Sequence, residues 1–410
     1  MEQSDQDQND PILLRSVKLT NLLSFGPDTL ALELKPLNVL IGPNGAGKSN
    51  LIEALALMRA TPVHPQTKSS GDIRGVIRRG GGVQEWIWQG AKADPATIEL
   101  VIDNPSGNEP LRHRFSFVGR EQAFKLNEEA IEDETPDNGG SESQFHYRLG
   151  FSGQNRRAVI NTRSEKNKKL PSEIVNSELS ILAQLREPLL YPEITYLAGI
   201  YDKWRIYREW TFGRNTIFRE PQKADMVNDR LEEDFSNLGL FLSRLKRVPK
   251  AAAAILEGLQ DLYEGLSGFD SIVEGGTVQV FFSEGDFSIP AVRLSDGTLR
   301  YLCLMSILCD PQPPPLVCIE EPELGLHPDI IPKLADHIVG ASHRTQLIVT
   351  THSDILIDAL SEQPEAVVVC EKHDGKTEMQ RVTRQDLIPW MDKYRLGQLW
   401  TSGQIGGTRW

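Results

Sequence analysis

The stretch Gly42-Pro43-Asn44-Gly45-Ala46-Gly47-Lys48-Ser49 matches the pattern G-x-x-x-x-G-K-S of a phosphate-binding loop. An apolar run, residues 37–41, precedes it, and an apolar-faced run, residues 51–57, follows it. A buried strand, a glycine-rich turn and a helix are the structural context that this motif requires. The stretch therefore predicts a nucleotide-binding strand–loop–helix unit in an α/β fold.

Each residue type in this loop has a physical task. Glycines let the backbone approach a phosphate closely, and the loop N–H groups together with the helix N-terminus form an anion nest. We expect Lys48 to reach the β- and γ-phosphates of ATP and Ser49 to ligate Mg²⁺. The predicted nucleotide contacts in this loop are Gly42, Asn44, Gly45, Gly47, Lys48, Ser49 and Asn50.

A second apolar run, residues 315–319, ends in the acidic pair Glu320-Glu321. At the carboxyl end of a buried strand beside a phosphate loop, one carboxylate can hold Mg²⁺ and the next can orient an attacking water. We assign Glu320 to the metal and Glu321 to the water, so the predicted metal ligands are Ser49 and Glu320. Taken alone, the pair also fits two solvated acids that begin a turn at Pro322.

A third apolar run, residues 346–350, places His352 at its carboxyl end, one helix-length after the acidic pair. Ligands of doubly wound sheets bind at this end of the strands. An imidazole there can hydrogen-bond a γ-phosphate and the water beside it. An isolated histidine would more often be satisfied locally, but the βαβ spacing favours a catalytic role for His352 with Glu321 and Lys48.

The run Leu294-Ser295-Asp296-Gly297-Thr298 opens a helix-like stretch that continues to residue 308. As a local pattern it predicts only a capped helix N-terminus. The hydroxyl of Ser295, the N–H of Gly297 and the helix N-terminus together also suit a γ-phosphate. We therefore add Ser295 and Gly297 to the predicted nucleotide contacts.

Taken in order, these four motifs resemble those of the ATP-binding-cassette (ABC) ATPases of the SMC/RecF/OLD branch, especially the bacterial "predicted ATPase" AAA-type subgroup. Residues 12–60 and 290–371 carry the resemblance. It implies an α/β fold, namely an ABC-ATPase head in which a P-loop NTPase sheet is flanked by an antiparallel β-subdomain. It also implies that two chains pair head-to-tail around two ATP molecules, so that Ser295 and Gly297 of one chain complete the Lys48/Glu321 site of the other.

The middle of the chain has no sustained heptad repeat, so we expect a compact, mainly helical inserted lobe in place of a coiled coil. Apolar residues at three- and four-residue steps predict helices over 172–187, 192–210, 226–248 and 250–266, and residues 271–280 and 281–289 read as a hairpin. Aromatic residues between 191 and 210 are expected in the core or an interface rather than in a base-stacking platform. The predicted division is a disordered tail (1–11), the first half of the head with Walker A and the β-subdomain (12–155), the helical lobe (156–270), the second half with signature, Walker B and His352 (271–371) and a C-terminal helix or tail (372–410).

The composition of the chain bears on whether its partner is DNA or a membrane. The chain of 410 residues has a net charge of −13, which argues against a broadly basic DNA-wrapping surface. Basic clusters at Arg156-Arg157 to Lys169 and at Arg74 to Arg79 fit either solvated loops or a local nucleic-acid contact. We find no signal peptide or transmembrane run, and the four cysteines lack metal-ligand spacing. We therefore expect a cytoplasmic protein with no membrane partner.

The leading hypothesis is an ATPase that hydrolyses ATP to ADP and phosphate as a homodimer or higher oligomer. About 58 residues follow His352, too few for the nuclease domain of OLD proteins, so we expect a separately encoded effector such as a nuclease. The resemblance associates such a chain with phage defence or DNA maintenance. The alternatives are a RecF-like repair ATPase that binds duplex DNA directly, the nucleotide-binding subunit of a transporter, and a nucleotide switch that does not hydrolyse ATP.

Overall fold

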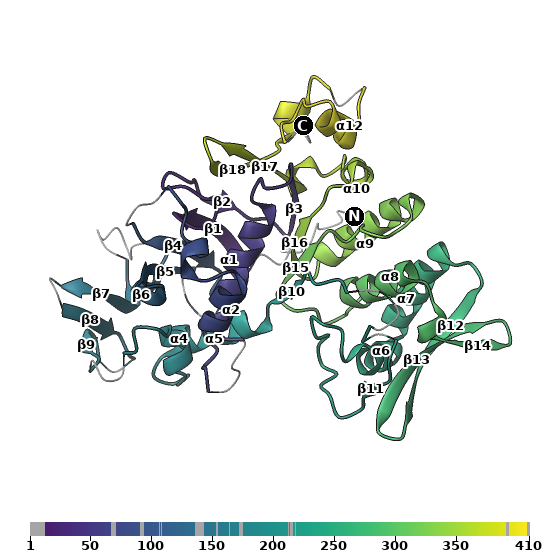
Figure 1. Cartoon of the computed structure of the whole chain (residues 1–410), viewed down its shortest axis with the longest axis horizontal. Coiled ribbons are helices and arrows are strands. Elements are labelled where there is room, and N and C mark those ends of the chain that lie inside the picture. The colour runs from purple at the N-terminus through teal and green to yellow at the C-terminus, as the bar shows by residue number, and fades with distance from the viewer. Residues whose placement is uncertain are drawn as a thin grey trace, which may run out of the picture.

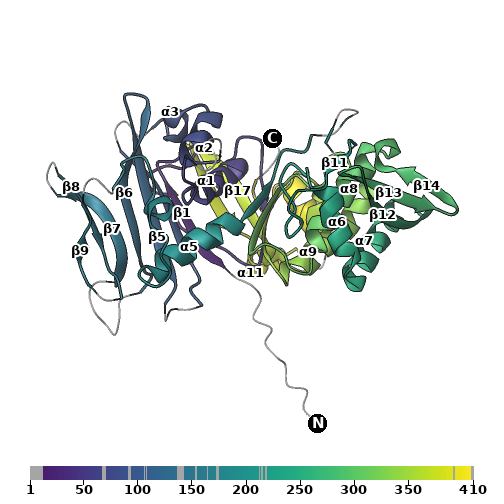
Figure 2. The same ribbon diagram turned by 90° about the horizontal axis from the view of Figure 1, so that it is seen from below.

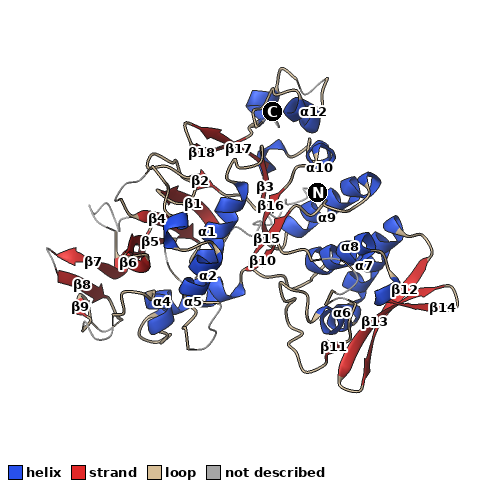
Figure 3. Cartoon of the chain, viewed as in Figure 1, coloured by secondary structure: helices blue, strands red, loops and turns tan. Residues whose placement is uncertain are grey.

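The part of the chain that the structure describes is organised by three β-sheets, and the phosphate-binding loop follows a strand of the central one (Figure 1; Figure 3, strands in red). A large antiparallel sheet and a smaller sheet lie at opposite ends of the molecule, with the central sheet between them (Figure 2). The computed structural model describes residues 13–66, 71–90, 94–105, 107, 109–135, 143–152, 155–163, 165–171, 175–211, 213, 216–217, 219–390 and 393–407.

The central sheet is parallel except at one edge. Its order is β10 (Arg205–Tyr207), β15 (Leu316–Glu320), β16 (Gln346–Thr350), β3 (Leu37–Ile41), β17 (Val367–His373) and β18 (Lys376–Arg381). Only the β17–β18 pair is antiparallel. All residues of β3 and β16 are buried, as expected for parallel strands covered on both faces.

Alternate residues of these strands point into two different cores. Leu40 and Ile348 belong to the core that includes α1 (Lys48–Ala60) and α5 (Pro192–Lys203). Their neighbours Val39 and Val349 belong to the core with α8 (Asp296–Leu308) and α9 (Ile331–Ser342). Helices therefore cover both faces of the sheet, and the loops at the carboxyl ends of its strands are left to form a site.

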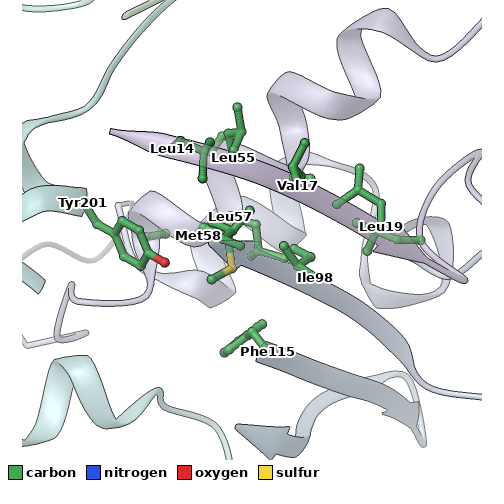
Figure 4. Packing of buried hydrophobic residues seen from close by; sticks show 14 of the residues in the cluster. Leu14, Val17, Leu19, Leu55, Leu57, Met58, Ile98, Phe115 and Tyr201 are labelled. Atoms are coloured by element: carbon green, nitrogen blue, oxygen red, sulfur yellow. The ribbon is translucent and has the colours of Figure 1, made fainter. Parts of the chain in front are cut away.

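The large sheet covers the first core on its outer side. Its antiparallel order is β2 (Leu32–Glu33), β1 (Leu14–Thr20), β4 (Ala96–Ile102), β5 (Leu111–Arg120), β6 (Ala123–Asp133), β7 (Phe145–Ser152), β8 (Asn155–Ile160) and β9 (Lys168–Lys169). Figure 4 shows apolar side chains of β1, β4 and β5, with Tyr201 of α5, gathered around Leu55, Leu57 and Met58 of α1. The helix that follows the phosphate-binding loop is thereby anchored in the core of this subdomain.

The smaller sheet packs with helices at the other end. It consists of β11 (Gln222–Lys223), β12 (Leu266–Glu274), β13 (Thr277–Glu284) and β14 (Phe287–Pro290), beside α6 (Leu238–Lys246) and α7 (Pro249–Leu262). Further helices among the described residues are α2 (Ile73–Arg79), α3 (Val83–Trp86), α4 (Ile181–Gln184), α10 (Asp354–Ala359), α11 (Arg384–Leu387), α12 (Leu396–Thr401), and the 3₁₀ turns η2 (Ala291–Arg293), η3 (Pro328–Ile330) and η4 (Pro364–Ala366). Within the described residues, none of the helices combines the length and the apolar character needed to cross a bilayer.

The fold class is confirmed as α/β with a P-loop sheet and a flanking antiparallel subdomain, but several predicted elements were too long. The helix predicted over 192–210 ends at Lys203, and Arg205–Tyr207 instead pairs with β15, because strand pairing overrides the local helical spacing. The helix predicted over 226–248 begins only at Leu238. Before it, the Asn237 amide donates to the main-chain O atoms of Val227 and Arg230 and stabilises a loop.

Two further differences concern turns and helix length. The predicted hairpin is three strands, and its first turn is Gly275-Gly276, with φ angles of 58° and 80° that suit a tight hairpin turn. The helix predicted over 172–187 spans only Ile181–Gln184. Residues 156–270 supply strands as well as helices, so the proposed domain boundaries stay a prediction, and the predicted tail 1–11 lies outside the described residues. The aromatic residues Tyr201, Trp204 and Tyr207 are buried.

Candidate nucleotide site

The phosphate-binding loop needs glycine at two positions for steric reasons. Gly42 has a φ of 140°, and a Cβ atom there would lie 2.1 Å from the main-chain O of Cys370. Gly47 has a φ of 101°, and its Cβ would lie 2.3 Å from Oγ1 of Thr377. Gly45, with a φ of 78°, faces open space at the exposed tip beside Asn44. Strands β17 and β18 therefore pack against the loop, while its tip is left open.

Lys48 lies folded against its own loop. Its Nζ donates to the main-chain O of Gly42 at 2.7 Å and to that of Pro43 at 3.1 Å. Burial lowers the pKa of Lys48, and the nearby Cys370, Glu321 and Glu320 oppose this shift. An anionic phosphate would relieve the cost of burying this ammonium group, which is the property expected of a phosphate ligand.

Asn50 contacts the turn after β1. Its Nδ2 donates to Oγ of Ser24 at 2.7 Å, and the same Oγ accepts from Thr377 Oγ1 at 2.6 Å. Asn50 thus ties the start of α1 to the turn after β1. The structure places Asn50 next to the loop, where it supports the loop through Ser24.

Ser49 and Glu320 lie together at the carboxyl end of β15. The Ser49 hydroxyl hydrogen-bonds the Glu320 carboxyl group, whose pKa is raised by burial. Oε1 of Glu320 is buried and lacks a hydrogen-bond partner among the described residues. A hydroxyl beside a carboxylate oxygen in need of a partner is a donor set that suits Mg²⁺.

A cavity of about 350 Å³ opens beside this pair. It is lined by Ser49, Glu53, Val76, Arg79, Gly80, Arg208, Glu209 and Glu320. Arg208 and Glu53 form an ion pair of 2.6 Å across it. Within the part of the chain that the structure describes, no group of three or more His, Cys, Asp or Glu side chains could hold a metal ion. A metal held by Ser49 and Glu320 would therefore take its further ligands from phosphate and water.

Glu321 and His352 meet at the ends of neighbouring strands. Oε1 of Glu321 lies 3.7 Å from Nε2 of His352, and the Glu321 side chain is 42 % exposed. Glu321 has a φ of 45°, a left-handed conformation that turns the chain sharply after β15. Its N–H donates to the main-chain O of Thr350 at 3.0 Å. The two residues predicted to act on the attacking water are thus brought together.

Glu323 is a site residue that the sequence prediction did not include. Its Oε1 accepts from Oγ1 of Thr351 at 2.7 Å and from the main-chain N of His352 at 2.9 Å. Burial raises the pKa of Glu323. The carboxyl group therefore fixes the loop that carries His352, and the signal for this role was a third acid within four residues after a buried strand.

The signature loop begins α8, a helix that belongs to the other core than α1. Ser295 caps α8, its Oγ accepting from the N–H of Thr298 at 3.1 Å, and a Cβ on Gly297 would lie 3.1 Å from the main-chain O of Gly325. Neither Ser295 nor Gly297 lines the cavity beside Ser49. Helices α1 and α8 belong to different cores and lie on opposite sides of the central strands (Figure 2).

The chain is similar to proteins of the Old and Smc types. The family whose profile matches residues 37–358 is described as "AAA domain, putative AbiEii toxin, Type IV TA system". Old nuclease of Escherichia phage P2 is 23 % identical over 398 residues, which are 89 % of this chain and 60 % of that protein. Chromosome partition protein Smc of Coxiella burnetii is 28 % identical over 245 residues, which are 58 % of this chain and 18 % of that protein. The chain thus spans less than two thirds of either relative.

Solved structures of Smc heads share the fold. A head bound to the C-winged helix domain of ScpA has a TM-score of 0.56 at 14 % identity and covers 92 % of this chain and 100 % of that one. A second head, with an extended coiled coil and derived from Pyrococcus furiosus, has a TM-score of 0.54 at 12 % identity, covering 93 % and 99 %. Because the matched region is most of its length, the chain belongs to this AAA-domain family and is an SMC/OLD-like ABC-type ATPase.

Proposed function

We propose that the chain binds ATP with Mg²⁺ and hydrolyses it to ADP and phosphate when two copies pair head-to-tail. The observation that carries this proposal is the division of the site. Lys48, Ser49, Glu320, Glu321 and His352 gather at the carboxyl ends of the central strands, whereas Ser295 and Gly297 begin α8, a helix of the other core. A second copy would supply the missing part.

Nucleotide binding would rearrange Lys48. Its ammonium group leaves the main-chain O atoms of Gly42 and Pro43 and turns to the phosphates. Ser49 and Glu320 would hold Mg²⁺, which when bound neutralises charge on the phosphate oxygens. The buried Oε1 of Glu320 would gain a ligand at the same time.

Hydrolysis would then depend on Glu321 and His352. The Glu321 carboxylate orients the attacking water and accepts its proton, while the His352 imidazole hydrogen-bonds the γ-phosphate. Attack on phosphorus breaks the bond to the β-phosphate oxygen and releases ADP and phosphate. The 3.7 Å between Oε1 of Glu321 and Nε2 of His352 leaves both side chains within reach of one water.

Pairing would bury apolar side chains that are now exposed. Val292, two residues before Leu294 in the signature run, is 50 % exposed, and Leu324, in the loop after Glu323, is 55 % exposed. Both flank the surface that a partner's γ-phosphate would have to approach. Exposed apolar side chains at such a position support a protein interface.

The output of pairing would be control of DNA or of an effector protein. The relatives are a nuclease of a phage and a chromosome partition protein, and the matched family's description names a toxin system. We therefore propose a role in phage defence or DNA maintenance, with an effector such as a nuclease acting on the paired state.

The test uses the full chain in which Glu321 is replaced by Gln. Glu321→Gln should bind ATP, fail to hydrolyse it and accumulate as a dimer, because the paired state is no longer released by turnover. Lys48→Ala is the matched control and should neither bind nucleotide nor pair. Size-exclusion chromatography with light scattering measures the mass in each case. A monomeric Glu321→Gln protein at saturating MgATP would contradict the pairing.

Direct DNA binding, as in a RecF-like ATPase, is the second candidate. Lys168 and Lys169 form the exposed edge strand of the large sheet, and Arg157 lies on the neighbouring strand β8. ATP-stimulated, strongly salt-dependent binding of duplex DNA that Arg157→Glu weakens would favour this reading. The side chain of Arg156 lies outside the described residues.

A further inference from the structure

We propose that Arg300 and Trp210 are a positioning pair that holds the backbone of Glu320 and Glu321. Through Arg300, a movement of the signature helix α8 would change the position of the Glu321 carboxylate. The inference rests on the proposed ATPase function and adds two residues to it. Neither side chain lines the cavity beside Ser49, and neither is among the site residues predicted from the sequence.

The pair holds two successive carbonyl groups. Nε1 of Trp210 donates to the main-chain O of Glu320 at 2.8 Å. Nη2 of Arg300 donates to the main-chain O of Glu321 at 2.7 Å. The two side chains also contact one another, because Cζ of Arg300 lies 4.6 Å from the centroid of the Trp210 ring. Two cooperating donors therefore fix the peptide groups on either side of the catalytic carboxylate.

The held backbone has a conformation that needs support. Glu321 has a φ of 45°, which residues with a Cβ atom rarely adopt. Strained backbone of this kind persists only where surrounding contacts hold it, and it is common at functional sites. Rotation of Glu321 to an ordinary φ would move its carboxylate away from His352 and would break the bond to Arg300.

The guanidinium group of Arg300 is buried, and its burial carries a cost in free energy. The residue is only 4 % exposed, and burial lowers its pKa to about 10 despite the attraction of Glu323. A buried guanidinium group costs desolvation that neighbouring charges only partly return. An apolar side chain of similar length would avoid this cost, but it would leave the main-chain O of Glu321 without this donor.

The two residues come from different parts of the molecule. Arg300 is on α8, the helix that Ser295 caps, and Trp210 follows β10 and stacks on Phe235 with centroids 5.4 Å apart. A shift of α8 on engagement of Ser295 by a partner's nucleotide would be passed by Arg300 to the carbonyl of Glu321. Trp210 would keep the neighbouring carbonyl in place.

The decisive variant is Arg300→Met, with Arg381→Met as its control. Arg381 also donates to main-chain O atoms, those of Glu365 and Glu33, and burial also lowers its pKa to about 10, but it lies on β18 at the edge of the sheet. Arg300→Met should reduce kcat about 10²-fold, as misplacement of a catalytic group does, with KM and thermal midpoint nearly unchanged. Arg381→Met should lower the thermal midpoint and leave kcat unchanged.

A double-mutant cycle tests whether Arg300 and Trp210 act together or as two independent contacts. Trp210→Phe keeps the ring but removes the Nε1 donor, and it should lower kcat less than Arg300→Met does. The double variant should be no slower than Arg300→Met alone, because the pair acts as a unit. Independent, multiplicative losses of kcat would overturn the pairing.

The outcomes distinguish this inference from the proposed function. If Glu321→Gln abolishes hydrolysis but Arg300→Met turns over at the wild-type rate, the positioning pair is refuted and the ATPase stands. If Arg300→Met loses thermal stability in proportion to its loss of kcat, its role is structural and the proposal fails. A wild-type chain that pairs but does not hydrolyse ATP refutes both.

Discussion

At the scale of single residues, the site contains two ionisable side chains, Lys48 and Glu320, whose charged forms are disfavoured by burial. Lys48 has a lowered pKa and Glu320 a raised one, each because of burial. Both shifts favour the neutral form in the absence of a ligand, and both groups would be used charged once phosphate and Mg²⁺ are present. The free protein therefore gives up stability at these positions in order to bind, a common trade at functional sites.

Glu320→Gln should reveal this cost through pH. Because the folded protein holds the proton of Glu320 more tightly than the unfolded chain does, stability falls as pH rises from about 4.5, the ordinary pKa, through the raised folded value. We expect Glu320→Gln to be more stable than wild type at pH 7, with the difference vanishing near pH 4, where the carboxyl group is protonated in both states.

Thermal unfolding of both proteins at the two pH values measures the difference. Glu274→Gln, at an exposed position of β12, is the matched control and should change nothing at either pH. MgATP should stabilise wild type but not Glu320→Gln. A variant equally destabilised at both pH values would show that Glu320 contributes hydrogen bonds rather than a strained charge.

At the scale of elements, a buried polar network joins the large sheet to its covering helices. Glu129 of β6 accepts hydrogen bonds from the Ser180 hydroxyl and, at 2.9 Å, from the main-chain N of Ile181. His113 of β5 lies between Glu129, at 3.3 Å, and the Tyr201 hydroxyl of α5, at 2.9 Å. Burial raises the pKa of Tyr201 well above its ordinary value. The network fixes α4 and α5 on the sheet that supports α1.

Glu129→Ala should destabilise the protein by about 3–5 kcal/mol, because removing one partner leaves buried polar groups unsatisfied. Glu129→Gln keeps an acceptor oxygen and should cost less. Urea unfolding followed by circular dichroism measures the free energy of unfolding. A change below about 1 kcal/mol for Glu129→Ala would mean that water replaces the carboxylate and that the network is not structural.

At the scale of the whole molecule, the exposed apolar side chains beside the signature loop matter only if the chain pairs. Leu324→Arg should weaken ATP-dependent dimerisation of the Glu321→Gln protein at least about tenfold, because a buried apolar contact is replaced by an uncompensated charge. Nucleotide binding by the monomer should not change. Sedimentation velocity over a range of protein concentrations measures the dissociation constant.

Ile388→Arg is the matched control for Leu324→Arg. Ile388 is 68 % exposed and follows α11 in the C-terminal segment, outside the signature run and the loop after Glu323. The control should dimerise like its parent. Equal weakening by both variants, or by neither, would place the interface elsewhere.

A structural feature could be predicted from the sequence where contiguous residues encode it. The phosphate-binding loop, the acidic pair and His352 each follow a short buried strand, so contiguous residues were enough to locate them. The helix expected over 192–210 was wrong at its end, because residues 205–207 pair with a strand more than a hundred positions later. Local spacing cannot report such a pairing.

The sequence by itself determined the family, the α/β class and the residues of the nucleotide loop, since each of these is encoded in unbroken patterns of residues. Only the tertiary structure decided which groups support Glu321 and His352, the proposed catalytic pair. Glu323 on the His352 loop, and Arg300 and Trp210 on the carbonyls of Glu321 and Glu320, are partners chosen by the order of strands and helices. Their hydrogen bonds join positions up to 110 residues apart, and no local propensity encodes a contact across that distance.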